Sequence, residues 1–266
     1  MIMALSPRQK QNYWRYSQYA LLALIAIVLV IVADWGTLRD KVFNPDIIAH
    51  QFPGVITVAL KNTLIYTALG FVVGLSLGVL LALMKISSIA PYRWISTLYI
   101  ELFRGLPALL VFIAFGYGIP LAFGLRLNNY VTVMLALGMV SAAYIGEVLR
   151  AGLEAVPKGQ YEAARSLGMG HSRAMVTVII PQAFRIVLPP LTNEIILLTK
   201  DSSLVYLLGM SVAQYELTKF GREGISASGA GLTPLVVAGA CYLIITVPLG
   251  LLARHFEKRA GARSRK

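Results

Sequence analysis

The sequence is poor in charge. Only 14% of its 266 residues are charged, whereas 57% are apolar and the mean hydropathy is +0.70. Soluble domains carry about 25% charged residues. This shortage of charge excludes an ordinary soluble domain and predicts an integral membrane protein.

Residues that build disulfides and metal sites are also scarce. The single cysteine, Cys241, lies in an apolar run, which excludes an internal disulfide and a cysteine-based metal cluster. The three histidines, His50, His171 and His255, lie far apart without HExxH spacing. We therefore expect no metal site. A membrane-embedded enzyme would need a catalytic cluster, and the apolar runs contain none.

The net charge of +12 has a topological explanation, because the basic residues flank apolar runs. We therefore expect no nucleic-acid partner. The first run, residues 16–33, follows Arg8, Lys10 and Arg15 and ends in Asp34-Trp35 without a small-residue cleavage site. We interpret it as a retained first helix and not as a cleaved signal.

About 20 apolar residues cross a bilayer as a helix. The chain offers six such segments, which predicts an all-α fold of about six transmembrane helices: residues 16–33, 62–84, 105–125, 127–146, 186–209 and 225–253. The fifth segment is less clean than the others because it contains Glu194, Lys200 and Asp201.

The basic residues also indicate an orientation. If the spans alternate, 17 of the 24 Lys and Arg residues lie on the side of the N-terminus, residues 85–104, residues 147–185 and the C-terminal tail. Positive charge accumulates on the cytoplasmic side. We expect both termini to be cytoplasmic.

Within the second predicted span, Gly70, Gly74 and Gly78 recur every four residues. Small residues at this spacing let two helices approach closely in lipid. The pattern predicts a tight helix–helix contact in the bundle.

The long loop at residues 147–185 contains its own helical signals. Pro157 ends the preceding helix, and a helix of about two turns is predicted over 160–167 with Gly168 as its stop. Ala163 and Ala164 offer a flat face that fits a groove, and Ser172 is placed to cap a second segment. On physical grounds alone, the loop also fits an ordinary cytoplasmic connector.

The motif within this loop is more specific. Glu162-Ala163-Ala164, three residues, Gly168, nine residues and the ending Val178-Ile179-Ile180-Pro181 resemble the EAA loop of binding-protein-dependent ABC importer permeases. The flanking segments resemble the polar amino acid (histidine, glutamate and glutamine type) branch of that family: residues 101–107, 144–164 and 200–204. Leu106 and Ser202 depart from the threonines usual in that branch. The resemblance covers roughly residues 55–253.

The resemblance implies an ABC type-1 permease fold in the bacterial inner membrane, with a coupling helix that docks on a cytoplasmic ATPase dimer. It implies that Glu162, Ala163, Ala164 and Gly168 lie at that joint. It also implies a second, identical or related, permease subunit and an extracytoplasmic solute-binding protein. The chain has no Gly-x4-Gly-Lys-Ser/Thr phosphate loop. We therefore expect no enzyme activity and no cofactor in this chain, with ATP and Mg bound by the partner ATPase.

The transport path needs polar groups inside the bundle. Lys200 would meet a substrate carboxylate and Asp201 a substrate ammonium, with Ser202 and Ser203 adding hydrogen bonds. The alternative is that Lys200 and Asp201 only pair with neighbouring helices.

Three further charged residues lie near the predicted cytoplasmic ends of spans. Glu101 and Arg104, expected at the start of the third span, would form a gate contact or only snorkel to the interface. Glu147, which closes the fourth span, is expected to support the coupling loop.

We divide the chain into residues 1–54 (cytoplasmic segment, first helix and periplasmic loop), 55–254 (permease domain) and 255–266 (basic cytoplasmic tail). The family core commonly has five spans, so the first helix is an addition of open role. An ion-driven secondary transporter is an alternative, but the chain shows none of the inverted repeats typical of that class. A non-transporting scaffold subunit is the other alternative.

Overall fold

The structure, a computed structural model, describes residues 7–125, 127–228 and 231–264. Every regular element in those ranges is helical. The long helices are α1 (Pro7–Val32), α4 (Lys61–Ile86), α5 (Ala90–Gly105), α8 (Asn129–Glu154), α11 (Ile180–Asp201) and α13 (Thr233–Ser264). The shorter ones are α2 (Trp35–Lys41), α3 (Pro45–Gln51), α6 (Ala108–Ile113), α7 (Ile119–Phe123), α9 (Lys158–Ser166), α10 (His171–Ala174) and α12 (Leu217–Ser228). The all-α prediction is confirmed for the described residues.

Several long helices continue through short π-helical or 3₁₀-helical segments into longer spans. Five helical stretches in the described ranges are long and apolar enough to cross a membrane: Gln11–Val32, Val55–Ile86, Asn129–Glu154, His171–Leu207 and Thr233–Arg259. The pair Ala90–Gly105 and Ala108–Phe123 passes the same test together, with a bend of 102°. The predicted number of six is reached when this bent pair counts as one span.

The third predicted span, 105–125, is wrong as a straight helix. α5 ends at Gly105, Leu106 is extended (φ −91°, ψ 137°), and α6 starts after Pro107. Proline lacks an N–H and disfavours helical geometry in the preceding residue, so the chain breaks there. The stretch 85–104, expected as a loop, is therefore mostly the helix α5.

Two other predicted boundaries are also wrong. The fifth span begins at His171 and not at 186, because the helix continues past Pro181 and holds Pro189 and Pro190 in its interior. The sixth span begins at Thr233, because residues 217–228 form the separate helix α12. Arg185 concealed the first boundary, whereas the second was concealed by the lack of charge from Ile225 onward.

α4 and α8 form the closest long helix pair of the bundle. A Cβ added at Gly70 would lie 2.7 Å from Leu137 Cβ, and one at Gly78 would lie 2.8 Å from Ile145 Cγ2. Both distances are too short for a real side chain, so only glycine permits this approach. The tight contact predicted from the glycine spacing is confirmed.

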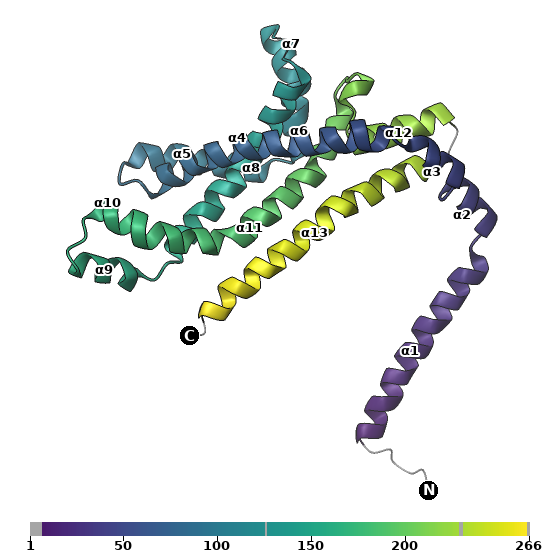
Figure 1. The fold of residues 1–266 in the computed structure, drawn as a ribbon, viewed down its shortest axis with the longest axis horizontal. Coiled ribbons are helices and arrows are strands. Elements are labelled where there is room, and N and C mark those ends of the chain that lie inside the picture. The colour runs from purple at the N-terminus through teal and green to yellow at the C-terminus, as the bar shows by residue number, and fades with distance from the viewer. Residues whose placement is uncertain (1–6, 126, 229–230, 265–266) are drawn as a thin grey trace.

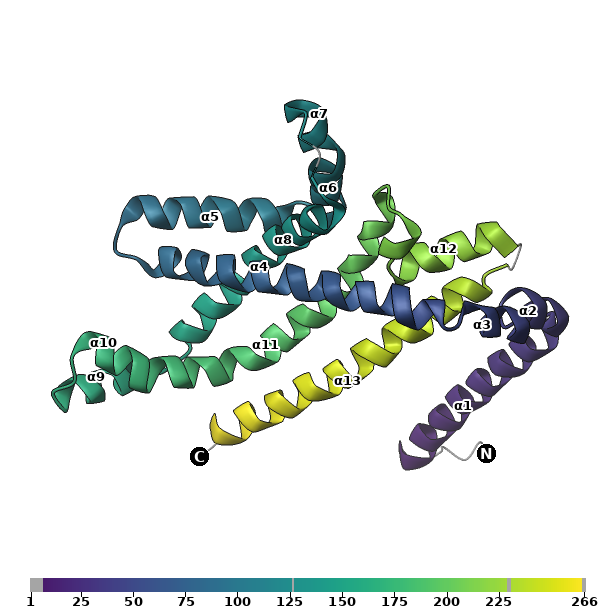
Figure 2. The ribbon, with the colours of Figure 1, turned by 45° about the horizontal axis from the view of Figure 1, so that its top comes forward.

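The main core lies where α4, α6, α8 and the end of α11 meet. Tyr66, Phe112, Val133 and Leu137 are buried there, together with Leu198. α1 stands apart from this core in both ribbon views (Figures 1 and 2), and all of residues 11–32 are exposed.

Different helices and turns lie at the two ends of the bundle. The α4–α5 turn, the α9–α10 hairpin and the C-terminal end of α13 lie toward one end of the molecule (Figures 1 and 2). α2, α3 and α12 lie toward the other end. The segment that carries the EAA-type motif is thus separated from the short helices by the length of the bundle.

Candidate coupling hairpin and transport cavity

α9 is the helix that the loop sequence predicts. It runs from Lys158 to Ser166, directly after Pro157, and differs from the predicted range by only one or two residues. Gly168 follows in the left-handed region, with φ +80°. Glycine adopts this conformation without the strain that a side chain would cause, so its predicted role as a helix stop is confirmed.

Side-chain contacts close α9 and α10 into a hairpin. Tyr161 and His171 share a hydrogen bond of 2.8 Å between the hydroxyl and Nδ1. The Arg165 guanidinium donates to the carbonyl of Met169 at 2.7 Å. The predicted cap is wrong, because Gly170 is the N-cap of α10 and Ser172 is already inside that helix. These contacts fix the hairpin as one small unit.

The exposed face of α9 carries most of the predicted coupling residues. Glu162, Ala163 and Gly168 are exposed. Ala164 is only 4% exposed. The flat exposed face predicted for both alanines is therefore wrong for Ala164, whose methyl group is buried.

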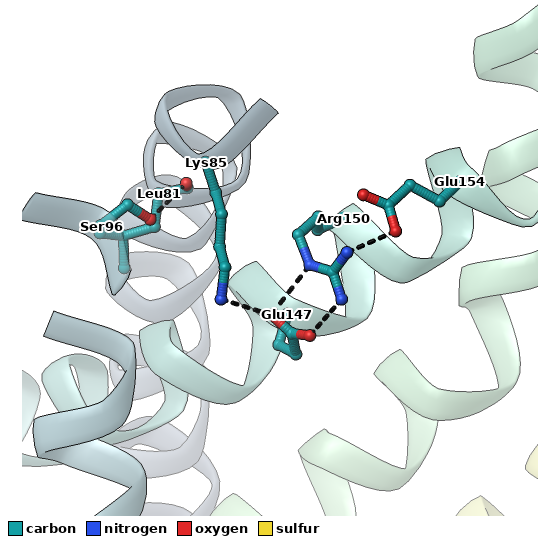
Figure 3. A network of polar contacts seen from close by, with 6 residues as sticks. All are labelled: Leu81, Lys85, Ser96, Glu147, Arg150 and Glu154. Carbon is teal, nitrogen blue, oxygen red and sulfur yellow. Dashed lines mark hydrogen bonds and ion pairs between the residues drawn. The ribbon is translucent and has the colours of Figure 1, made fainter. Parts of the chain in front are cut away.

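A charged network joins the last turns of α8 to the end of α4 (Figure 3). Lys85 Nζ lies 3.2 Å from Glu147 Oε2, and Arg150 donates through Nε to the same oxygen at 3.1 Å. Arg150 also pairs with Glu147 Oε1 and with Glu154. Because Lys85 and Glu147 belong to different helices, the network ties the end of α4 to the last turns of α8.

A cavity of about 190 Å³ lies inside the bundle, where the α5–α6 break meets α8 and α11. This volume far exceeds the roughly 10–15 Å³ that one water molecule needs. The lining residues are Leu106, Ala108, Phe112, Leu137, Val140, Ser141, Tyr144, Glu194, Leu197, Leu198 and Asp201. The wall is mostly apolar with a few polar groups, which is typical of small-molecule sites.

The predicted path residues are only partly brought together there. Asp201 lines the cavity, whereas Lys200 is exposed and is not part of the lining. Ser202 is buried, and its hydroxyl donates a hydrogen bond of 2.7 Å to the carbonyl of Thr199, three residues earlier in the chain. Ser203 is half-buried outside the lining.

Arg104 and Glu101 lie elsewhere than expected. They occupy the last turn or so of α5, about 20 Å along the helix from its start, because a helix rises 1.5 Å per residue. The Arg104 Cζ lies 5.7 Å from the centre of the Tyr144 ring, and Tyr144 lines the cavity. Their predicted position at the beginning of the span is therefore wrong, since the span begins at Ala90 and breaks after them.

Comparison with known proteins decides the family. Residues 74–261 match the family described as the binding-protein-dependent transport system inner membrane component. The chain belongs to this family. This permease is 34% identical over 209 residues to the arginine transport system permease protein ArtQ of Bacillus subtilis, covering 79% of this chain and 93% of that one. It is 38% identical over 199 residues to the probable glutamine ABC transporter permease protein GlnM of the same organism, covering 74% and 89%.

Solved structures agree with this assignment. The permease superposes on a chain from the crystal structure of an amino acid ABC transporter with histidines, with a TM-score of 0.71 and 36% identity, over 79% of this chain and 96% of that one. A bacterial ABC transporter involved in the import of the acidic polysaccharide alginate shares the fold, with a TM-score of 0.66 and 16% identity over 96% of this chain. The permease is therefore a multi-pass inner-membrane transport subunit with the predicted type-1 fold.

Sequence reasoning missed several residues of the permease site. Glu194 is an ionisable residue within a predicted span. Its spacing of seven residues from Asp201 also places the two carboxylates on one helix face, which could have indicated a shared site. The sequence did not indicate which residues Tyr144, Lys85 and Arg150 contact. Their contacts depend on how α4, α5 and α8 are rotated against one another.

Within the described residues, no group of three or more His, Cys, Asp or Glu side chains is placed to hold a metal ion.

Proposed function

We propose that this chain is the membrane subunit of an ATP-driven importer of polar amino acids. The observation that carries the proposal is family membership together with relatives and a solved structure that are named for amino acid transport. The chain would work with a cytoplasmic ATPase dimer that binds ATP and Mg, a second permease subunit and an extracytoplasmic solute-binding protein.

The α9–α10 hairpin is the proposed contact with the ATPase. It lies at one end of the bundle (Figure 1) and exposes Glu162, Ala163 and Gly168. Because its internal hydrogen bonds hold it as one unit, a displacement of the hairpin by the ATPase would be passed on to α8 and α11, which flank it. Such rigid-body motion is a common form of conformational coupling.

The Lys85–Glu147–Arg150 network extends this coupling to α4. It lies on the last turns of α8, just before the chain enters the hairpin (Figure 3). With α4 and α8 tied together, movement of the hairpin would shift both walls of the bundle. This role agrees with the support of the coupling loop that we expected of Glu147.

The cavity between the α5–α6 break, α8 and α11 is the proposed part of the transport path. Asp201 and the 93% buried Glu194 give it two carboxylates in an otherwise apolar wall. Ionisable groups inside a membrane bundle are costly, and they normally line a substrate or ion pathway. A substrate ammonium group fits these carboxylates.

The orientation that we propose places the hairpin and both termini in the cytoplasm. It is supported by the 17 of 24 basic residues on that side of the predicted topology. The common position of the hairpin, the α4–α5 turn and the end of α13 agrees with it (Figures 1 and 2).

The proposal is tested by reconstituting the permease with its ATPase and binding protein in vesicles and measuring ATP-dependent uptake of amino acids. Glu162→Lys should reduce uptake by roughly tenfold or more, because it reverses a charge on the docking face. Glu257→Lys is the control, since Glu257 is an exposed glutamate of α13 outside the hairpin.

Unchanged uptake and complex assembly in Glu162→Lys would contradict the coupling role. Uptake that persists without the ATPase would indicate a secondary transporter. A stable complex that transports no amino acid would indicate a scaffold subunit.

A further inference from the structure

The last turns of α13 extend beyond the apolar part of that helix. α13 runs from Thr233 to Ser264, over 32 residues, whereas its uncharged stretch ends at Ala253. Because a helix rises 1.5 Å per residue, residues 233–253 cover roughly 30 Å, which is the thickness of the hydrocarbon core. The turns after Ala253 therefore lie at the level of the lipid headgroups and in the water beyond them.

These turns carry a concentrated positive charge. Residues 254–266 contain six Lys and Arg residues and a single acidic residue, Glu257. Residues 34–61, which include α2 and α3 at the opposite end of the bundle, contain three Lys and Arg residues and three aspartates. The basic residues at the end of α13 thus lack the compensation that acidic residues provide at the other end.

The basic side chains share the exposed side of α13. Successive helical residues are 100° apart around the axis, so four residues fall within an arc of roughly 140°: Arg254, His255, Lys258 and Arg259. All four are exposed, whereas Phe256, outside this arc, is half-buried. The basic arc therefore faces away from the bundle, where it can contact another surface.

The cations of this arc have no ionic partner within the described part of the chain, because none of its ion pairs includes Arg254, Lys258 or Arg259. All three lie within six residues of Ala253, or about 9 Å along the helix. This is comparable to the Debye length of about 8–10 Å. Each Lys or Arg so placed strengthens binding to an anionic membrane surface by roughly fivefold.

The position of the basic arc favours lipid over the ATPase as its partner. The end of α13 stands apart from the α9–α10 hairpin, which is the proposed ATPase contact, in both ribbon views (Figures 1 and 2). Arg254 follows the apolar stretch directly. A cation at that depth meets the phosphates of the headgroups, which are strong acceptors for Arg and Lys.

We propose that the basic end of α13, formed by Arg254, Lys258 and Arg259, binds the headgroups of anionic phospholipids. In the orientation proposed above, these are lipids of the cytoplasmic leaflet. α13 packs along α11 and α12, so the bound lipids hold this side of the bundle at a fixed depth in the membrane. The inference concerns the membrane partner and does not depend on which solute is transported.

The test measures lipid binding to the purified permease–ATPase complex in detergent by native mass spectrometry. Phosphatidylglycerol, which is anionic, is compared with zwitterionic phosphatidylcholine of the same acyl chains. Phosphatidylglycerol should bind the unaltered complex roughly tenfold or more tightly, and the triple variant Arg254→Gln, Lys258→Gln and Arg259→Gln should lose most of this preference. Binding of phosphatidylcholine should be the same in both complexes.

Two further variants serve as controls. The triple variant Arg39→Gln, Lys41→Gln and Lys61→Gln also removes three exposed basic residues, but at the other end of the bundle, and should keep the preference. The double variant Arg254→Lys and Arg259→Lys should keep it as well, because lysine carries the same charge as arginine.

Several results would overturn the inference. An unchanged preference in the α13 triple variant would exclude this surface as a lipid site. An equal loss in both triple variants would show that only the net charge attracts the lipid. Loss of the ATPase from the α13 variant, with an unchanged preference, would assign the surface to the ATPase. Displacement of phosphatidylglycerol by inorganic phosphate, beyond the effect of sodium chloride at equal ionic strength, would assign it to free phosphate.

Discussion

Charged residues of this permease fall into two kinds according to their partners. Lys85, Glu147 and Arg150 neutralise one another at the end of α4 and α8. Glu194 lines the cavity, is only 7% exposed and belongs to no ion pair among the described residues. Paired charges fix helices against one another, whereas unpaired charges in an apolar interior need a ligand or a partner subunit. Burial and pairing therefore separate structural from functional charges better than residue type does.

Glu216 is a buried carboxylate outside the membrane spans. It accepts hydrogen bonds from the backbone N–H groups of Thr218 and Lys219 at 2.6 Å each, and from the Tyr242 hydroxyl at 3.0 Å. Burial raises its pKa from 4.5 to about 7, although these hydrogen bonds act in the opposite direction. The folded state therefore binds the proton more tightly than the unfolded state does.

The resulting prediction concerns stability against pH. The contribution of Glu216 is fully present below about pH 4.5 and is lost as the pH rises through about 7, which corresponds to roughly 3 kcal/mol. Glu216→Gln keeps an oxygen acceptor but cannot ionise. The thermal midpoint of the unaltered protein should fall more between pH 5 and pH 8 than that of the variant. An identical fall in both proteins would contradict the prediction.

At the scale of helices, the break between α5 and α6 is the element that shapes the site. Leu106 and Ala108, on the two sides of Pro107, both line the cavity. The extended Leu106 and the following Pro107 produce the 102° bend. The same break explains why hydropathy alone misplaced the third span.

The network between α4 and α8 leads to a prediction at this scale. Lys85→Glu places a carboxylate against Glu147 and should reduce ATP-coupled uptake by several-fold while ATP hydrolysis continues, because α4 is no longer tied to α8. The double variant Lys85→Glu with Glu147→Lys restores an ion pair with reversed charges. It should recover only part of the uptake, because Arg150 then faces a lysine in place of Glu147. The measurement is the ratio of substrate transported to ATP hydrolysed.

A purely structural role gives a different result. In that case, uptake and hydrolysis would fall together in Lys85→Glu, with an unchanged ratio. Glu223→Gln serves as a control, because it removes the surface ion pair of Lys219 and Glu223 on α12, away from the network.

At the scale of the whole molecule, α1 differs from the other long helices because it does not pack against the bundle. All of residues 11–32 are exposed, and α1 lies away from the other helices (Figures 1 and 2). The amino acid transporter chain that this permease superposes on covers 79% of it, whereas the alginate transporter chain covers 96%.

Deletion of residues 2–33 should leave the thermal midpoint of the purified permease–ATPase complex within a few degrees of the full chain. The reason is that none of residues 11–32 is buried, and loss of about 1 kcal/mol shifts the midpoint of a domain of this size by roughly 2–4 °C. A drop well beyond that range, measured by thermal unfolding in the same detergent, would show that α1 packs on the complex.

The sequence by itself determined the membrane class, the family resemblance, a close helix contact at the glycines of α4 and the α9 helix with its stop at Gly168. Each of these is encoded by neighbouring residues, through hydropathy, periodicity or a local motif. The tertiary structure alone decided that Arg104 lies beside Tyr144, that Lys85 pairs with Glu147, and that Asp201 lines the cavity whereas Lys200 does not. These relations depend on how helices bend and rotate against one another, which residues distant in the chain determine together.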